Sequence, residues 1–223
     1  MSKLPNKIIP ISNADKQWHE HWYKNRNMLN IPHPSRVLLL GPPNMGKTTV
    51  IKNLIIRQHP PFEEIFVIHC DADYTEEYKD LGEEVHMLSE IPAPEEWSGA
   101  CKTLVVVDDL ELKNMKQDQR KNLDRLFGYC STHKNLSVYL TSQDAFNVMP
   151  IVRRCSNFFI FWRSIDLESM AQCARKTGMS TNDFNNIFKT FKEPRDSLWI
   201  DMTDGSDYKL RKNGFTLLKK IEK

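Results

Sequence analysis

Residues 36–49 read RVLLLGPPNMGKTT, and this stretch decides the fold. It matches the pattern G-x-x-x-x-G-K-[ST] directly after an apolar run and directly before a segment of helical character, which is the strand–loop–helix order of a phosphate-binding loop. An ordinary Gly-Pro turn that caps a helix is the alternative, and the order of the elements disfavours it. The residues predicted to bind the nucleotide are Gly41, Pro42, Pro43, Asn44, Met45, Gly46, Lys47, Thr48 and Thr49.

Each residue type in this loop has a chemical role. Gly41 and Gly46 allow backbone conformations closed to other residues, so successive N–H groups turn inward at the start of a helix and bind an anion. The Lys47 ammonium is expected to bridge phosphate oxygens, and the Thr48 hydroxyl is expected to ligate Mg²⁺. The predicted ligands are therefore ATP and Mg²⁺.

Short apolar runs alternate with helical segments, which predicts a parallel sheet with crossover helices. We expect an α/β fold: a P-loop NTPase with a RecA-like, additional-strand, mainly parallel sheet flanked by helices, plus a C-terminal β-hairpin. Helices are expected at 47–58, 118–131 and 166–177, and the hairpin at 197–202 and 208–210 around Asp204-Gly205. The five core strands are expected at 36–40, 65–69, 103–107, 136–141 and 158–161.

The length of 223 residues fits one domain. We divide the chain into an appended N-terminal segment, 1–35, and a P-loop ATPase domain, 36–223. Composition excludes several classes of protein. The net charge of +2 excludes a uniformly basic surface, so any DNA contact must be local. The five cysteines form no C-x-x-C pair, which favours reduced thiols. Neither a transmembrane run nor a secretory signal is expected.

A second motif follows the run 104–107, where an apolar strand ends in two carboxylates. Asp108 is placed to hold Mg²⁺, and Asp109 could act as general base on the attacking water. Neighbouring side chains at the end of a strand point to different sides, which allows two roles. A solvated Asp-Asp turn is the alternative.

Two further candidates lie downstream. The strand at 136–141 ends in Ser142-Gln143, so Gln143 could reach the γ-phosphate or the attacking water. Arg153 and Arg154 precede the next strand and could reach a neighbouring subunit's ATP as a trans-acting finger. The sequence leaves open that Gln143 only caps its strand and that the arginines are a surface pair.

Two basic patches are candidate contacts with DNA phosphates. Solvated charge runs are the common alternative. The candidate residues are Lys113, Lys116, Arg120 and Lys121 after the carboxylate pair, and Lys209, Arg211 and Lys212 near the C-terminus.

With these motifs in order, residues 36–216 resemble the poxvirus-type genome-packaging ATPases of large DNA viruses and virophages, within the FtsK/HerA superfamily. The resemblance rests on 41–49, 105–110, the stretch HKNLSVYLTSQ at 133–143, and the arginines before Ser156-Asn157. It implies the roles given above for Lys47, Thr48, Asp108, Asp109 and Gln143, and a trans finger at Arg153 or Arg154. Many members have Glu where this chain has Asp109, which is a departure.

The resemblance also implies partners and a place of action. Such proteins form homo-oligomeric rings, pentamers or hexamers, that pull double-stranded DNA into a preformed capsid, and a capsid vertex protein is an expected partner. The expected location is the virion or the virus factory of the host cell, without a membrane. Competing interpretations are a P-loop nucleotide kinase, an ATP-gated assembly or scaffolding protein, and a membrane-anchored assembly ATPase of the filamentous-phage type.

Overall fold

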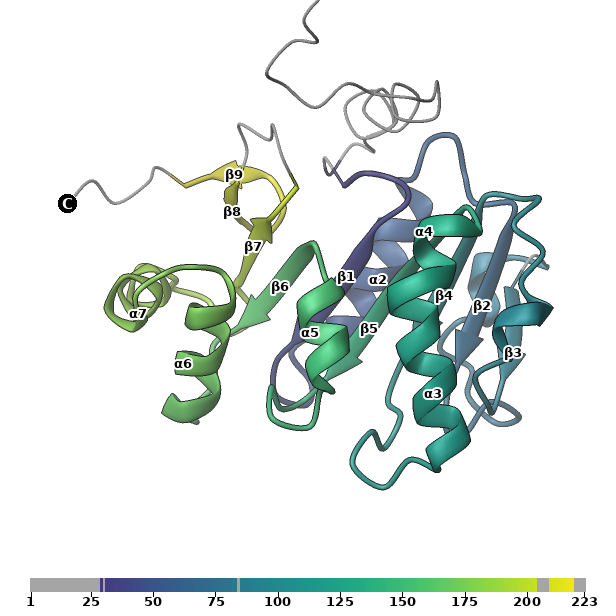
Figure 1. Cartoon of the computed structure of the whole chain (residues 1–223). Coiled ribbons are helices and arrows are strands. Elements are labelled where there is room, and N and C mark those ends of the chain that lie inside the picture. Colours follow the sequence, from purple (N-terminus) through teal and green to yellow (C-terminus); the bar gives the residue numbers. More distant parts are fainter. Residues whose placement is uncertain (1–28, 30, 84, 204–208, 219–223) are drawn as a thin grey trace, which may run out of the picture.

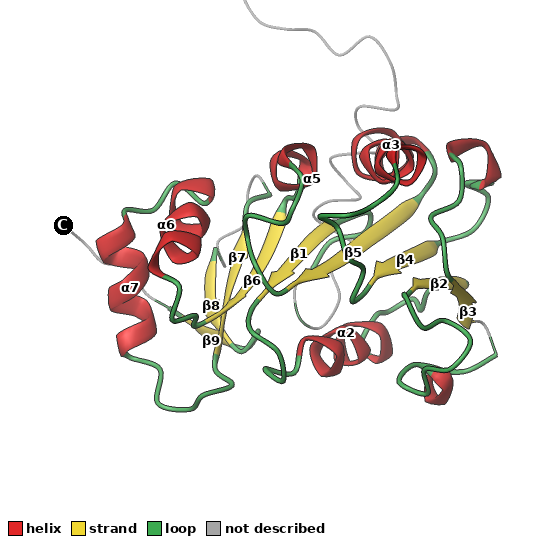
Figure 2. Ribbon diagram, turned by 90° about the horizontal axis from the view of Figure 1, so that it is seen from below, coloured by secondary structure: helices red, strands yellow, loops and turns green. Residues whose placement is uncertain are grey.

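The computed structural model describes residues 29, 31–83, 85–203 and 209–218, which form one twisted nine-stranded sheet with helices on both faces (Figure 1, Figure 2). The order across the sheet is β3-β2-β4-β5-β1-β6-β7-β8-β9. Most of the predicted segment 1–35 and the predicted turn Asp204-Gly205 lie outside the described residues. The strands are β1 (Arg36–Leu40), β2 (Glu64–Ile68), β3 (Val85–Leu88), β4 (Thr103–Val107), β5 (Leu136–Ser142), β6 (Phe158–Trp162), β7 (Ser197–Asp201), β8 (Leu210–Lys212) and β9 (Thr216–Leu217).

The strands β1 to β6 are parallel, whereas β7, β8 and β9 add to the sheet in antiparallel fashion. The predicted class is therefore confirmed, including the C-terminal hairpin, because β7 pairs with β8 from Leu198↔Lys212 to Ile200↔Leu210. The five predicted core strands correspond to β1, β2, β4, β5 and β6. The short edge strand β3 was not predicted.

The helices are arranged on both faces of the sheet, α2 on one and α3 and α5 on the other, with α6 and α7 beyond β6 (Figure 2). The predicted helix at 118–131 begins as an α-helix and continues through a π-helical turn, Leu126–Cys130. The α-helices are α2 (Lys47–Ile56), α3 (Gln117–Arg125), α4 (Ser131–His133), α5 (Pro150–Cys155), α6 (Leu167–Lys176) and α7 (Thr181–Lys189), and the 3-10 turns are η1 (Lys79–Leu81) and η2 (Pro94–Glu96).

The strand β1 lies at the centre of the sheet and is covered on both faces. Leu38 and Leu40 belong to the core under α3, α5, α6 and α7, whereas Val37 and Leu39 belong to the core under α2. This alternation is the period of two that a strand imposes on its side chains. It explains why the sequence of β1 is continuously apolar, as in other parallel strands buried on both sides.

The strand β5 lies between β1 and β4, so the phosphate-loop strand and the carboxylate strand are not neighbours. Its register aligns Leu40 with Ser142 and Val107 with Leu140. Because all three strands are parallel, the loop after β1, the carboxylates after β4 and the polar end of β5 meet at one edge of the sheet. Within the described residues no helix is both long and apolar enough to cross a membrane.

Candidate active site

The phosphate loop connects β1 to α2, and its lysine is folded back into the loop. The Lys47 Nζ donates hydrogen bonds to the carbonyls of Gly41 (2.8 Å) and Pro42 (2.9 Å). The side chain is buried, and burial lowers the pKa of Lys47, while the carboxylates of Asp108 and Asp109 oppose the shift. A buried ammonium that has only carbonyl partners is a favourable site for an anion.

Two loop residues adopt the left-handed backbone conformation, Asn44 with φ 62° and Gly46 with φ 88°. The prediction that Gly41 needs an unusual backbone angle is wrong, because its φ is not positive. Gly41 is instead required by close packing: a Cβ at this position would lie 2.8 Å from the Cβ of Trp162. Gly41 is therefore required because it packs against β6, and Gly46 because it adopts the left-handed turn that starts α2.

Asp108 is the centre of the site and is only 3% exposed. Its Oδ2 accepts hydrogen bonds from Thr48 Oγ1 (3.1 Å) and Tyr78 Oη (2.5 Å), and its Oδ1 accepts one from Thr141 Oγ1 (2.5 Å). The carboxylate thus links the phosphate loop, the η1 segment and strand β5. The contact with Thr48 places two oxygen ligands of the kind that Mg²⁺ prefers next to each other at the loop, so the predicted metal ligands fit that ion.

Tyr78 was missed by the sequence analysis. Its side chain is fully buried next to η1, and burial together with the charge of Asp108 raises the pKa of Tyr78 far above its ordinary value of 10.0. The phenol therefore stays protonated and donates to the carboxylate. No motif marks it, because the tyrosine lies thirty residues before Asp108 in a loop whose path depends on the tertiary fold.

Asp109 differs from Asp108 in backbone conformation and in exposure. It adopts φ 54°, is exposed, and its backbone N–H donates to Thr141 Oγ1 at 3.3 Å. Gln143 Nε2 donates to Asp109 Oδ1 at 3.4 Å, so the structure brings these two predicted residues together. They line an open cavity of about 360 Å³ that Lys113 and Asn147 also border. The pair is placed to contact a water molecule there.

The arginine pair lies elsewhere. Arg153 and Arg154 are on α5, whose end is followed by the amino end of β6, whereas the phosphate loop follows the carboxyl end of the parallel strand β1. The Arg153 guanidinium is half-buried and donates to the carbonyl of Ala145 at 2.7 Å. Arg154 is exposed, and no hydrogen bond or ion pair of its side chain is found within the described residues. Neither arginine joins the nucleotide site of its own subunit.

The candidate DNA contacts fall into two groups. Lys113, Lys116, Arg120 and Lys121 are all exposed after β4, although Lys116 pairs with Glu90 at 3.3 Å. In the second group only Lys209 is exposed.

The prediction for Arg211 is corrected, because its side chain is 4% exposed, donates to the carbonyls of Leu29 and Gly214, and so cannot reach DNA. Lys212 pairs with the buried Asp196 at 2.6 Å, so it is already engaged in the fold.

The fold is that of a P-loop NTPase. Two parallel strands carry the phosphate loop and the carboxylates. The strand between them, β5, contacts the carboxylates through Thr141 and the loop through the Ser142 carbonyl, which accepts from the Gly41 N–H. Comparisons with known proteins were informative only at the level of solved structures. No protein-family model matches the chain, and no curated protein sequence matches it.

Solved structures do match. The DNA-packaging ATPase B204 from Sulfolobus turreted icosahedral virus is similar with a TM-score of 0.61 and 17% identity, over 81% of this chain and 97% of that one. B204 from Sulfolobus turreted icosahedral virus 2, solved in complex with ATP-gammaS, gives 0.55 and 16%, over 83% and 98%. The pCW3 conjugation coupling protein TcpA gives 0.54 and 13%, over 82% of this chain and 61% of that one. The predicted resemblance to packaging ATPases of the FtsK/HerA type is thus confirmed at the level of the fold.

Proposed function

We propose that this chain is the ATP-hydrolysing subunit of a motor that translocates double-stranded DNA into a viral capsid. The observation that carries the proposal is the position of Asp108, which contacts Thr48 of the phosphate loop and Thr141 of β5 at once. This arrangement connects nucleotide binding to β5, the strand that Gln143 follows. The similarity in fold to the packaging ATPase B204 over most of both chains supports the same assignment.

Binding of the nucleotide begins at the loop. The backbone N–H groups of residues 44–48 and the Lys47 ammonium would hold the phosphates, with the ammonium leaving its present carbonyl partners. Thr48 and Asp108 would hold Mg²⁺, which neutralises charge on the phosphate oxygens when bound. Because Asp108 is nearly buried, its carboxylate keeps a fixed orientation toward the loop.

Hydrolysis requires a positioned water. Asp109 is exposed at the cavity and accepts from Gln143, so the carboxylate would take the proton of the attacking water while the amide orients it. Asp108 is 3% exposed and bound by three hydroxyl groups, whereas Asp109 is exposed and adopts a left-handed backbone conformation. This difference supports different roles for the adjacent carboxylates.

The site is completed from outside the subunit in this proposal. The Arg153 guanidinium donates to Ala145, just after the carboxyl end of β5, and within the described residues neither arginine has a hydrogen bond to the phosphate loop of its own subunit. The proposal therefore assigns the pair to the ATP of a neighbour. Arg154, exposed and without a partner in the described part of the chain, is the better candidate for this trans finger, since Arg153 is held by Ala145. Such a finger implies a homo-oligomer, because a single subunit would leave its own site incomplete. A ring of five or six subunits is what the resemblance to packaging ATPases implies.

The DNA would be held by the exposed residues Lys113, Lys116, Arg120 and Lys121, with Lys209 as a second contact. Lys113 borders the same cavity as Asp109 and Gln143, so loss of the γ-phosphate could change the contact between Lys113 and the DNA. We place the ring at a capsid vertex, in contact with a vertex protein, in the virion or the virus factory.

ATP hydrolysis tests this proposal when it is measured with and without long double-stranded DNA. The wild type is expected to hydrolyse ATP faster with DNA, whereas Lys47→Ala loses nucleotide binding and Asp109→Asn keeps binding but loses turnover. Turnover that ignores DNA would favour an ATP-gated scaffold. Phosphorylation of an acceptor nucleotide in place of release of phosphate would favour a kinase. Full activity in Asp109→Asn would contradict the hydrolytic mechanism.

A further inference from the structure

The proposed function leaves the nucleoside half of ATP without a binding surface, and the inference below rests on that function. The hydrolytic residues Asp108, Asp109 and Gln143 follow β4 and β5, which lie on one side of β1 in the sheet. The γ-phosphate must face them. Since the loop encloses the phosphates of an elongated ligand, the ribose and the base must leave on the other side, over β6 and β7.

Two arginines reach that side at the level of the loop. The register pairs Leu40 with Phe161 and Trp162 with Ser197, so the residue after β6 and the residues just before β7 lie at the edge of the sheet that carries the loop. These residues include Arg163 and Arg195. The sequence analysis singled out neither, because their proximity depends on the antiparallel pairing of β7.

A chain of contacts connects Arg195 to the loop itself. Trp162 packs against Gly41 so closely that a Cβ there would clash, and its indole N–H donates to the carbonyl of Arg195 at 3.2 Å. Gly41 therefore contacts Trp162, and Trp162 in turn contacts the backbone of Arg195. A movement of one must displace the next, because packed interiors are not easily deformed.

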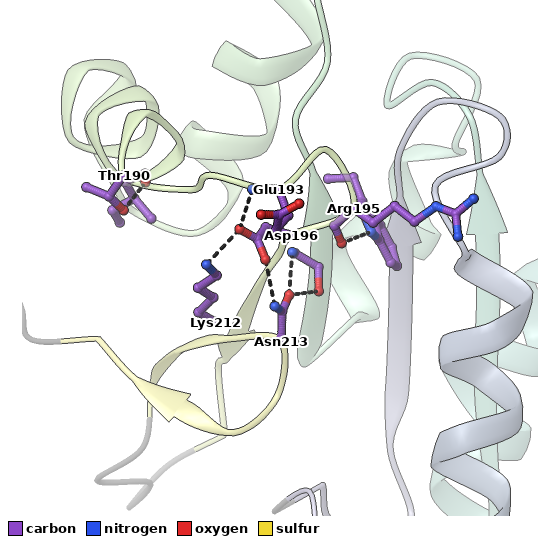
Figure 3. Close-up of polar contacts among 9 residues, drawn as sticks. Thr190, Glu193, Arg195, Asp196, Lys212 and Asn213 are labelled. Carbon is purple, nitrogen blue, oxygen red and sulfur yellow. Dashed lines mark hydrogen bonds and ion pairs between the residues drawn. The ribbon is translucent and has the colours of Figure 1, made fainter.

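The segment before β7 is held firmly by a buried carboxylate (Figure 3). Asp196, 5% exposed, accepts from Lys212 Nζ (2.6 Å), Asn213 Nδ2 (2.8 Å) and the backbone N–H of Glu193 (3.0 Å). Figure 3 shows the Arg195 side chain extending away from this cluster, toward the ribbon of β1 and α2. The cluster thus fixes the backbone and leaves the guanidinium free to bind a ligand.

Both guanidinium groups are exposed, and within the described ranges neither has a hydrogen bond or an ion pair. Arg36 and Arg153 do have such partners, the carbonyls of Cys155 and Ala145, whereas Arg154 is exposed and without one in the described part of the chain. What sets Arg163 and Arg195 apart is their place beside β6 and β7 at the edge of the sheet that carries the loop. Two exposed guanidinium groups at the edge of the sheet that carries the loop match the chemistry of a nucleoside, because a guanidinium stacks on an aromatic base and donates to ribose hydroxyls.

We propose that Arg163 and Arg195 bind the ribose and adenine of the ATP held by the phosphate loop of the same subunit. They would contact the nucleoside and would not contact Asp108, Asp109 or Gln143, which lie on the other side of the loop. This separates them from Lys47, which binds phosphates, and from the candidate finger Arg154, which would act on a neighbour.

A matched pair of ligands tests the proposal: ADP and inorganic pyrophosphate share a diphosphate, and only ADP has a nucleoside. Their affinities are measured by titration calorimetry with Mg²⁺ present. In the double variant Arg163→Ala/Arg195→Ala the affinity for ADP is expected to fall about tenfold or more, and that for pyrophosphate is expected to stay within about twofold. The backbone carbonyl that Trp162 uses is kept in this variant, so the contact with Gly41 is retained.

The control variant Arg125→Ala/Arg175→Ala removes the same charge from two exposed arginines on α3 and α6, and is expected to bind both ligands like the wild type. An unchanged affinity for ADP in the double variant would overturn the inference. Equal losses for ADP and pyrophosphate would also overturn it, since they would indicate a general effect of charge or folding. A wild type that binds neither ligand would overturn the proposed ATPase function as well. If the wild type binds both ligands, the double variant tests the nucleoside contacts alone.

Discussion

The hydroxyl of Tyr78 donates a hydrogen bond to Asp108 Oδ2 at 2.5 Å, and the phenol is entirely buried. The same carboxylate oxygen accepts from Thr48, so Tyr78 lies directly behind the candidate metal site. Residues that hold a metal ligand from behind often affect metal binding as strongly as some ligands do. Tyr78 is a positioning residue in this account, since it acts through Asp108.

Tyr78→Phe removes this hydrogen bond and keeps the ring. The free energy of unfolding is expected to fall by about 1–3 kcal/mol, because a buried carboxylate loses a donor. The Mg²⁺ concentration for half-maximal ATP hydrolysis is expected to rise about tenfold. Denaturant unfolding and a Mg²⁺ titration measure the two effects. Tyr74→Phe is the control, since Tyr74 is 83% exposed, and equal behaviour of the two variants would contradict the assigned role.

Gly41→Ala tests the packing of the loop on β6. The added methyl group would lie 2.8 Å from the Cβ of Trp162, so backbone must move and stability is expected to fall by about 1–3 kcal/mol, together with nucleotide affinity. At Gly128 nothing lies within 4 Å of an added Cβ. Gly128→Ala is therefore expected to be neutral or slightly stabilising in the same unfolding experiment. A tolerated Gly41→Ala would show that the close contact with Trp162 is not required.

The ion pair between Lys212 and Asp196 predicts a pH dependence. Burial alone would raise the pKa of Asp196, but hydrogen bonds from Lys212 and Asn213 hold it below its ordinary value of 3.8. A lowered carboxyl pKa stabilises the fold above the unfolded value, and this contribution is lost as the pH falls through the folded value. Lys212→Met is therefore expected to cost about 2 kcal/mol at pH 7, and the difference from the wild type should close below pH 3.8.

The control for this pH series is Lys116→Met, which removes an ion pair whose side chains are 75% and 61% exposed. Its effect on unfolding is expected to stay below about 1 kcal/mol at any pH. A loss in Lys212→Met that persists unchanged at low pH would indicate lost packing rather than the ion pair.

Mixed rings test the trans finger. Arg154→Ala keeps its own phosphate loop, and Lys47→Ala keeps its own arginine, so each variant alone is expected to be inactive while a mixture regains ATP hydrolysis. Recovery follows because a Lys47→Ala subunit can complete the site of an Arg154→Ala neighbour. Arg153→Ala is the comparison, and no recovery is expected with it, because Arg153 is held by Ala145 within its own subunit. An inactive Arg154→Ala mixture would contradict the assignment.

The sequence predicted the parts of this fold that local pattern determines. Continuous apolar runs identified β1, β2, β4, β5 and β6, because strands buried on both faces have few polar residues. It missed β3, whose residues are only half-buried at the sheet edge, and α7, whose Asn-rich sequence is a weak helix former. The α7 helix forms because Phe184, Ile187 and Phe188 pack on one face, and Ser180 caps its start.

The residues of the candidate site also fall into those that a local pattern predicts and those that it does not. Lys47, Thr48, Asp108 and Asp109 follow strands at known spacings, so pattern alone placed them. Tyr78, Arg163 and Arg195 approach the site through long-range pairing, which no local spacing records. For Arg211 the local pattern gave a wrong prediction. The basic run near the C-terminus indicated an exposed DNA contact, but Arg211 packs inside the fold over Phe158 and Trp199.

Directional movement along DNA is the central claim, and displacement of a third strand measures it most directly. A labelled oligonucleotide forms a triplex near one end of linear double-stranded DNA, and its release is followed after the protein and a nucleotide are added. The account predicts release by the wild type with ATP, and none with ATPγS or with Lys47→Ala. A protein that hydrolyses ATP at full rate on this DNA and never displaces the third strand would contradict it.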